Sequence, residues 1–138
     1  MKKIYVLDAC ALIAVLSAEV GANKVVDVYE QVILGKAELV MNVVNLLEVY
    51  YDDYRHHGKE AADKMLSSVK ALSIKIITET DDTLFSEAGR LKASYRISLA
   101  DAFALAQAKV TEGILLTSDH HEFDIIENKE PIKFLWIR

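Results

Sequence analysis

The chain alternates short, continuous apolar runs with longer segments in which apolar residues recur at helical spacing. Residues 4–7 (Ile-Tyr-Val-Leu) form the first such run, which is typical of a strand buried on both faces of a sheet. Runs at residues 38–41, 74–77, 114–116 and 133–137 predict further strands. Because strands alternate with helices, the pattern indicates an α/β layer fold with a mostly parallel sheet of four to five strands.

Between these runs the periodicity predicts helices over residues 9–17, 22–34, 42–57, 61–72, 84–95 and 98–113. Asn42 or Asn45 can cap the third helix, and Gly58 can end it. Two helices are expected to turn apolar sets toward the core: Val25, Val26, Val28, Tyr29, Val32 and Ile33 in the second, and Leu99, Ala102, Phe103, Ala106 and Val110 in the last.

Composition indicates one compact domain over residues 1–138. Hydrophobic residues make up 52% of the chain and charged residues 27%, and there is neither a linker-like stretch nor an internal repeat. Cys10 is the only cysteine, so no intramolecular disulfide is possible, and a reducing, cytoplasmic location is expected. A signal peptide is not expected, because Asp8 interrupts the apolar N-terminal segment and only residues 4–7 precede Cys10. No other run is long and apolar enough to span a membrane.

The chain is acidic, with 16 basic and 21 acidic residues and a net charge of −5. This balance counts against a nucleic-acid binder, since phosphates are usually contacted by basic surfaces. A phosphate substrate would require locally placed cations or bound metal ions.

Four carboxylates stand out by their position. Asp8 directly follows the first predicted strand, and Asp119 comes three residues after the fourth, so both should lie at the same edge of a parallel sheet. Glu48 lies among apolar neighbours in the third helix. Asp101 is the conspicuous charge near the start of an otherwise apolar helix.

Each acid also has an ordinary structural explanation. Asp8 can be a turn or N-cap residue, and Asp101 can form a capping box with Ser98. Glu48 can be an exposed helix residue or pair with a base, and Asp119 can be a loop residue. As a set, however, four acids at one rim repel each other and raise one another's pKa, which a fold does not need for stability.

A divalent cation would make sense of this set. Oxygen ligands favour hard ions, here Mg²⁺ or Mn²⁺, which activate water and stabilise charge in phosphoryl chemistry. The adjacent pairs His56-His57 and His120-His121 lack zinc-like spacing and are interpreted as solvated loop residues.

In these residues the chain resembles PIN domains, and among them the VapC-type toxins of prokaryotic toxin–antitoxin pairs. The matching segments are residues 5–8 (Tyr-Val-Leu-Asp) with 11–13 (Ala-Leu-Ile), 45–49 (Asn-Leu-Leu-Glu-Val), 98–106 (Ser-Leu-Ala-Asp-Ala-Phe-Ala-Leu-Ala), and 116–119 (Leu-Thr-Ser-Asp) followed by Glu122 and Phe123. They fall in the family's order and cover nearly the whole chain. The resemblance implies a three-layer α/β/α fold.

The resemblance also implies an activity: a metal-dependent endoribonuclease that uses one or two Mg²⁺ or Mn²⁺ ions. By position, Asp8, Glu48 and Asp101 resemble the principal metal ligands, and Asp119 the fourth acid. Ser98 and Thr117 resemble hydroxyl residues that orient acids or substrate, while Glu122 shares the place of the fourth acid. The implied reaction is in-line attack of a metal-activated water on an RNA phosphodiester, leaving a 5′-phosphate and a 3′-hydroxyl.

Partners implied by the resemblance are an RNA substrate, an antitoxin protein that covers the active-site groove, and a second copy in a homodimer. Tyr50, Tyr51 and Tyr54 cluster on one helix and fit an interface, although tyrosines packed on the core are the ordinary alternative. Phosphates can be held by Arg90, Lys92 and Arg96, which equally fit a solvated helix face.

Other functions stay open at this point. A phosphatase with an Asp nucleophile after its first strand needs a second Asp two residues on, where Cys10 stands. A receiver-like signalling domain needs paired acids at the first strand, and Asp8 has no acidic neighbour. A PIN-like module without catalysis and a PIN nuclease of RNA processing without an antitoxin are further alternatives.

Overall fold

A five-stranded sheet forms the centre of the computed structural model, which describes residues 2–138; Met1 of the predicted domain lies outside them. The strands are β1 (Lys3–Leu7), β2 (Ala37–Asn42), β3 (Lys75–Ile77), β4 (Ile114–Thr117) and β5 (Lys133–Trp136), in the order β3-β2-β1-β4-β5. All four neighbouring pairs are parallel. The predicted α/β class and strand number are therefore confirmed, and the sheet is wholly parallel.

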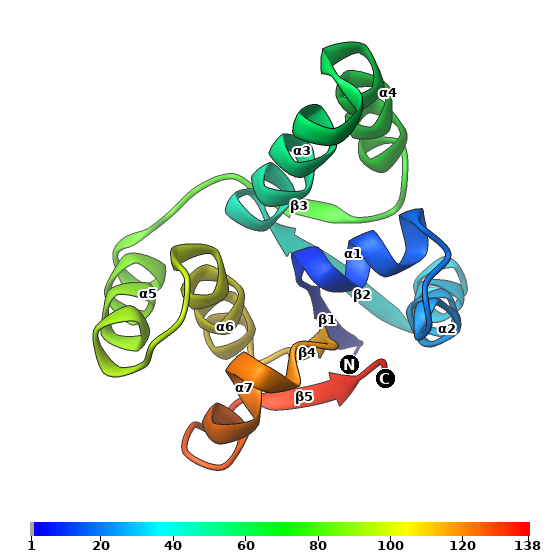
Figure 1. Ribbon diagram of the computed structural model, residues 1–138. Coiled ribbons are helices and arrows are strands. Elements are labelled where there is room, and N and C mark those ends of the chain that lie inside the picture. The colour runs from blue at the N-terminus through cyan, green and yellow to red at the C-terminus, as the bar shows by residue number, and fades with distance from the viewer. Residues whose placement is uncertain (1) are drawn as a thin grey trace.

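Helices cover the sheet from both sides, which gives the three layers (Figure 1). The helices are α1 (Ala9–Leu16), α2 (Ala22–Ile33), α3 (Val43–His57), α4 (Lys59–Lys70), α5 (Asp82–Ser94), α6 (Leu99–Thr111) and α7 (His120–Glu127). In Figure 1, α5, α6 and α7 lie to one side of the central strands, and α1 and α2 lie to the other.

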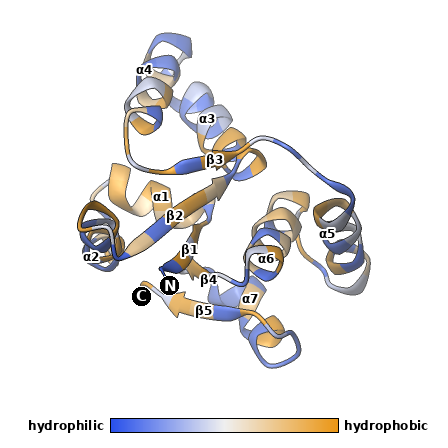
Figure 2. Ribbon diagram, turned by 180° about the vertical axis from the view of Figure 1, so that it is seen from behind, coloured by the Kyte–Doolittle hydropathy of each residue, from blue (hydrophilic) through white to orange (hydrophobic). Residues whose placement is uncertain are grey.

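Two separate apolar cores hold these layers together. One packs α5, α6 and α7 against the sheet through side chains such as Leu91, Leu105 and Phe123, and the other packs α1 to α4 through residues such as Leu12 and Met41. Figure 2 shows mostly hydrophobic strands at the centre and hydrophilic outer turns on α4. The apolar strand runs of the sequence are thus explained by burial under helices on both faces.

The element bounds differ from the predicted ones by a few residues, with one larger difference. Helix α7 was not predicted, because its eight residues carry too few apolar positions to show a helical period. It corrects the loop assignment of His120-His121, which begin this helix, and His56-His57 likewise end α3 rather than lie in a loop.

Three apolar residues that were expected to face the core are exposed. Val26, Ile33 and Leu99 are 44%, 62% and 58% accessible. The inward assignment of Val26, Ile33 and Leu99 was therefore wrong. Ile33 is the last residue of α2 and Leu99 the first residue of α6, so both lie at helix ends. Across residues 2–138, no helix has both the length and the apolar character required to cross a membrane.

Candidate metal centre

A cavity of about 180 Å³ lies at the carboxyl edge of the sheet, where β1 and β4 end. Its lining consists of Asp8, Ala9, Cys10, Asn45, Glu48, Ser98, Asp101, Asp119 and Glu122. The four predicted acids, together with Ser98 and Glu122, therefore meet at one place although they come from segments more than 100 residues apart. Thr117, the last residue of β4, is completely buried beside Cys10.

The meeting point follows from the parallel topology. Each strand points the same way, so the helices that follow the strands begin at one edge. Asp8 is the N-cap residue of α1 and accepts a hydrogen bond from the Ala11 amide at 2.8 Å. Asp119 is the N-cap residue of α7 and accepts from the Glu122 amide at 3.2 Å.

Asp101 is held by the predicted capping box. The Asp101 amide donates to the Ser98 hydroxyl at 3.0 Å, and the Ser98 amide donates to the Asp101 carboxylate at 3.3 Å. The capping explanation and the convergence of the acids are therefore both correct, because the helix starts themselves orient the carboxylates toward the cavity. The positive ends of these helices also favour negative charge there.

Burial, and after it the charge of neighbouring carboxylates, raises the pKa of Asp8, Glu48 and Asp101. Burial raises the pKa of Asp8 to about 6, and the charge of Asp101 adds to this effect. The pKa of Glu48 is raised by burial and by Asp101, Asp52 and Asp119. The pKa of Asp101 is raised by burial, against the hydrogen bonds from Ser98, and by Asp119 and Glu122. Buried acids that destabilise each other's ionised form are candidates for a cation site or a catalytic site.

The chemistry of the lining fits a hydrated hard cation. Within residues 2–138, no three acidic, histidine or cysteine side chains are close enough to form a ready-made metal cage. Mg²⁺ keeps several of its waters and is commonly held by one or two carboxylates, so a spaced set of oxygen donors suits it. Asp8, Glu48, Asp101 and Asp119 are the residues that would hold it. The resemblance implies that Asp8, Glu48 and Asp101 all bind one ion directly. In this structure the three carboxylates are not close enough together to do so.

Asn45 also lines the cavity, although the sequence analysis gave it no role in the site beyond a possible cap and a place in a matching segment. Asn42 is the N-cap residue of α3, and its side chain accepts from the Val44 amide at 2.9 Å. Asn45 is 2% exposed and donates to the Ala100 carbonyl at 2.9 Å. The spacing to Glu48, three residues along the same helix, was the available signal for its place in the site.

The three predicted RNA-binding residues do not line this cavity. Arg90 is paired with Glu87 and with Glu130, at 2.5 Å and 2.6 Å, so its charge is already compensated within the protein. Lys92 and Arg96 are exposed, Lys92 near the end of α5 and Arg96 just before α6.

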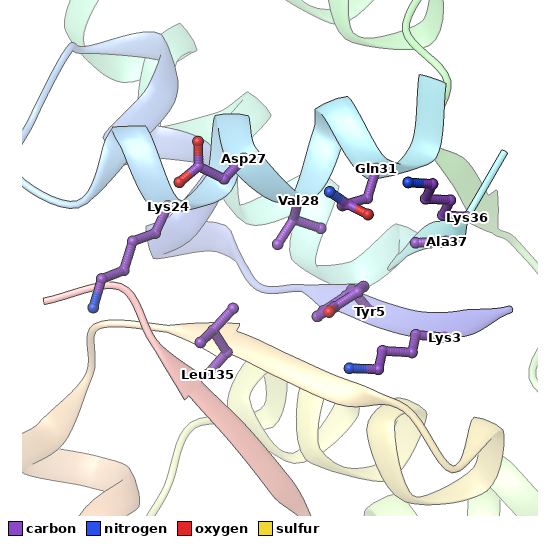
Figure 3. Close-up of a pocket in the computed structure, with 9 residues that line it drawn as sticks. All are labelled: Lys3, Tyr5, Lys24, Asp27, Val28, Gln31, Lys36, Ala37 and Leu135. Carbon is purple, nitrogen blue, oxygen red and sulfur yellow. The ribbon is translucent and has the colours of Figure 1, made fainter. Parts of the chain in front are cut away.

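A second cavity, of about 580 Å³, lies near the amino ends of β1 and β2 (Figure 3). In Figure 3, side chains of α2 face Tyr5 and Leu135 across it, and Lys3, Lys24 and Lys36 surround it. Asp27 is its only acidic residue. Since this cavity lies at the edge opposite the carboxylates, it takes no part in the candidate metal centre.

Solved structures with the same architecture include bacterial toxin–antitoxin proteins. A toxin–antitoxin complex from Klebsiella pneumoniae is 18% identical, with a TM-score of 0.69 and coverage of 97% of this chain and 98% of that chain. VapBC-1 from nontypeable Haemophilus influenzae is 16% identical, with a TM-score of 0.73 and the same coverage. DNA-bound VapBC from Salmonella typhimurium is 16% identical, with a TM-score of 0.70, and both chains are covered completely. At such low identity these similarities establish a shared fold.

No curated protein sequence matches the chain. The model of the PIN domain family, however, matches residues 5–129, which include all four acids and most of the fold described above. The strand order, the acidic edge and this match agree, and the chain therefore belongs to the PIN domain family.

Proposed function

We propose that the protein is a metal-dependent endoribonuclease and the toxin of a type II toxin–antitoxin pair. The observation that carries this proposal is the convergence of Asp8, Glu48, Asp101 and Asp119 on one cavity in an otherwise ordinary domain. Membership of the PIN family favours a nuclease over the phosphatase and receiver alternatives. The VapBC proteins of the same fold support the narrower assignment to a toxin.

In this proposal the four acids would hold Mg²⁺ or Mn²⁺, which would supply a nucleophilic water and stabilise charge at the phosphodiester. The chain itself orients the ligands. Thr117 favours the ionised form of Asp8, and its hydroxyl accepts a hydrogen bond from the Asp119 amide at 3.1 Å. Ser98 fixes Asp101 through the capping box, while Glu122 lies beside Asp119 and adds negative charge at the rim.

RNA cleavage by the purified protein tests the nuclease. We expect Mg²⁺- or Mn²⁺-dependent cleavage that leaves 5′-phosphates and 3′-hydroxyls, and at least about 100-fold less activity in Asp8→Asn. Glu79→Gln changes an exposed acid away from the cavity and is the matched control. Equal rates for Asp8→Asn and wild type would remove Asp8 from the reaction. No cleavage by either protein would favour the alternative of a PIN module that only binds a partner.

Growth arrest tests the role as a toxin. Expression of the chain should arrest growth, and co-expression of the neighbouring upstream open reading frame should relieve the arrest. Normal growth together with RNA cleavage in vitro would favour the RNA-processing alternative. The antitoxin partner, the RNA substrate and a cytoplasmic location are part of the same proposal.

A homodimer is supported by the outer face of α3. Leu47, Tyr51 and Tyr54 are spaced one or two turns apart and are 56%, 45% and 45% exposed. Tyr50 differs, since its hydroxyl donates to Asp63 of α4 and the side chain is half-buried. Light scattering on the wild type and on Tyr51→Glu with Tyr54→Glu measures the oligomeric state, and a monomeric wild type would contradict the homodimer.

A further inference from the structure

The side-chain oxygen of Asn45 is a buried acceptor without a donor. Across residues 2–138, Asn45 Oδ1 is the one buried side-chain nitrogen or oxygen atom that has no hydrogen-bond partner. Leaving such an atom unpaired is costly, and buried polar groups in folded proteins are nearly always satisfied. Because Asn45 lines the acidic cavity, a group bound in that cavity is the available candidate for the missing partner.

The orientation of the amide follows from its other half. Nδ2 donates to the Ala100 carbonyl at 2.9 Å, and only the NH₂ group can fill that role, because a carbonyl has no hydrogen to give. Turning the amide over would place two acceptors against each other. Oδ1 is therefore the atom left facing away from Ala100.

Asn45 also connects the two helices that carry cavity acids. It lies three residues before Glu48 on α3, which places both side chains on the same face of the helix. Its hydrogen bond reaches Ala100 in α6, the residue before Asp101. A leucine of similar size would fill this space without an unpaired oxygen, so packing alone does not require an amide.

The groups around the cavity explain what kind of donor is missing. Most of its polar groups are carboxylates, which are acceptors when ionised and therefore cannot satisfy Oδ1. The Cys10 thiol donates to Asp8 instead, and the Ser98 hydroxyl makes no hydrogen bond to Oδ1. A divalent cation or a water bound to it is electropositive, and amide oxygens are ordinary ligands of hard cations. We propose that Asn45 Oδ1 is a neutral oxygen ligand for the hydrated Mg²⁺ or Mn²⁺ ion. This inference rests on the proposed metal centre and adds a residue to it.

Binding of Mn²⁺ without RNA tests this role separately from activity. We expect Asn45→Ala to bind Mn²⁺ at least about tenfold more weakly than wild type, measured by calorimetry and by the electron paramagnetic resonance of free Mn²⁺. Asn45→Asp keeps an oxygen but loses the amide donor to Ala100, and it should bind Mn²⁺ at least as tightly as wild type. If the only role of Asn45 were its hydrogen bond between α3 and α6, both variants would bind Mn²⁺ more weakly than wild type.

Asn42→Ala is the matched control for lost stability. Asn42 is 1% exposed, but both ends of its amide are paired, with the Val44 amide and with Gln107, and it does not line the cavity. Its replacement should lower the melting temperature and leave Mn²⁺ affinity unchanged.

Two results would overturn the inference: an unchanged Mn²⁺ affinity in Asn45→Ala, or Mn²⁺ binding at least tenfold weaker in Asn45→Asp. If wild type itself did not bind Mn²⁺, the metal centre and this inference would both fall. If Asn45→Ala failed to fold, the Asn45→Asp comparison would decide alone.

Discussion

The thiol of Cys10 lies 3.1 Å and 3.2 Å from the two carboxylate oxygens of Asp8. Burial, and then the charge of Asp8, raise the pKa of this thiol to about 11. Cys10 is therefore protonated at neutral pH and donates to the acid, in the position where a phosphatase would need a second aspartate.

Cys10 should react slowly with alkylating agents, because the thiolate is the reactive form. At pH 8 we expect alkylation by iodoacetamide on the order of 100-fold slower than for a free thiol of ordinary pKa. Mass spectrometry over time measures the rate, and the same protein in guanidinium is the control. If Cys10 of the folded protein reacted nearly as fast as glutathione, the raised pKa of its thiol would be contradicted.

Asp8→Asn should stabilise the protein in EDTA. An acid whose pKa rises on folding binds its proton more tightly in the folded state, so stability falls as pH rises from the ordinary value of 3.8 toward about 6. An asparagine at position 8 can still cap α1, and because it does not ionise, it avoids the loss of stability at higher pH. We expect the gain in unfolding free energy to grow across that window and reach roughly 1–3 kcal/mol at pH 7.

Urea denaturation between pH 4.5 and 7.5 measures this gain. Glu79→Gln, which changes an exposed acid, is measured beside it as the matched control. A constant difference between Asp8→Asn and wild type at all pH values would contradict the raised pKa of Asp8. A more stable but inactive Asp8→Asn would show that the acidic edge is kept for activity at a cost in stability.

Glu130 should matter for stability and not for metal or RNA binding. Its side chain is 8% exposed and accepts from Arg90 at 2.6 Å and from Tyr95 at 2.6 Å. The hydrogen bond from Arg90, and after it the one from Tyr95, lowers the pKa of Glu130. Ionised Glu130 therefore stabilises the fold at neutral pH, and this stabilisation is lost as the pH falls below the ordinary pKa of 4.5. We expect Glu130→Gln to lower the unfolding free energy by about 1–2 kcal/mol at pH 7.

Arg90→Ala, assayed beside Glu130→Gln, distinguishes a structural from an RNA-binding arginine. Because Arg90 is paired inside the protein, its loss should act on melting temperature. Lys92→Ala with Arg96→Ala should instead reduce the salt dependence of RNA affinity if these residues contact phosphates. Weaker RNA binding by Arg90→Ala without a change in stability would contradict the structural role.

Gly21→Ala should be more damaging than Gly35→Ala. Both glycines have positive φ, at 99° and 77°, so alanine strains the backbone at either position. At Gly21 the new Cβ would also lie 2.7 Å from the carbonyl oxygen of Ile137, whereas at Gly35 it would meet nothing within 4 Å. We expect about 1 kcal/mol lost at Gly35 and at least about 2 kcal/mol at Gly21. Equal losses in urea denaturation would show that the contact with Ile137 relaxes.

The order of strands and helices and the edge that carries the acids were readable from the sequence. Continuous apolar runs mark strands buried on both faces, and such strands run parallel when helices connect them. Asp8 and Asp119 follow strands directly, so parallel topology alone brings them to one edge. Ser98 and Asp101 form a capping box, which is a local interaction between residues three apart.

The tertiary structure decided what depends on contacts between distant segments. The pairing of Arg90 with Glu130 spans 40 residues, and the bond from Asn45 to Ala100 spans 55. Local periodicity carries no information about such pairs, and it also failed for the short helix α7. Whether a polar side chain is exposed, paired, or buried with an unpaired oxygen depends on what folds against it, and for Asn45 that was decided only when α3 packed on α6.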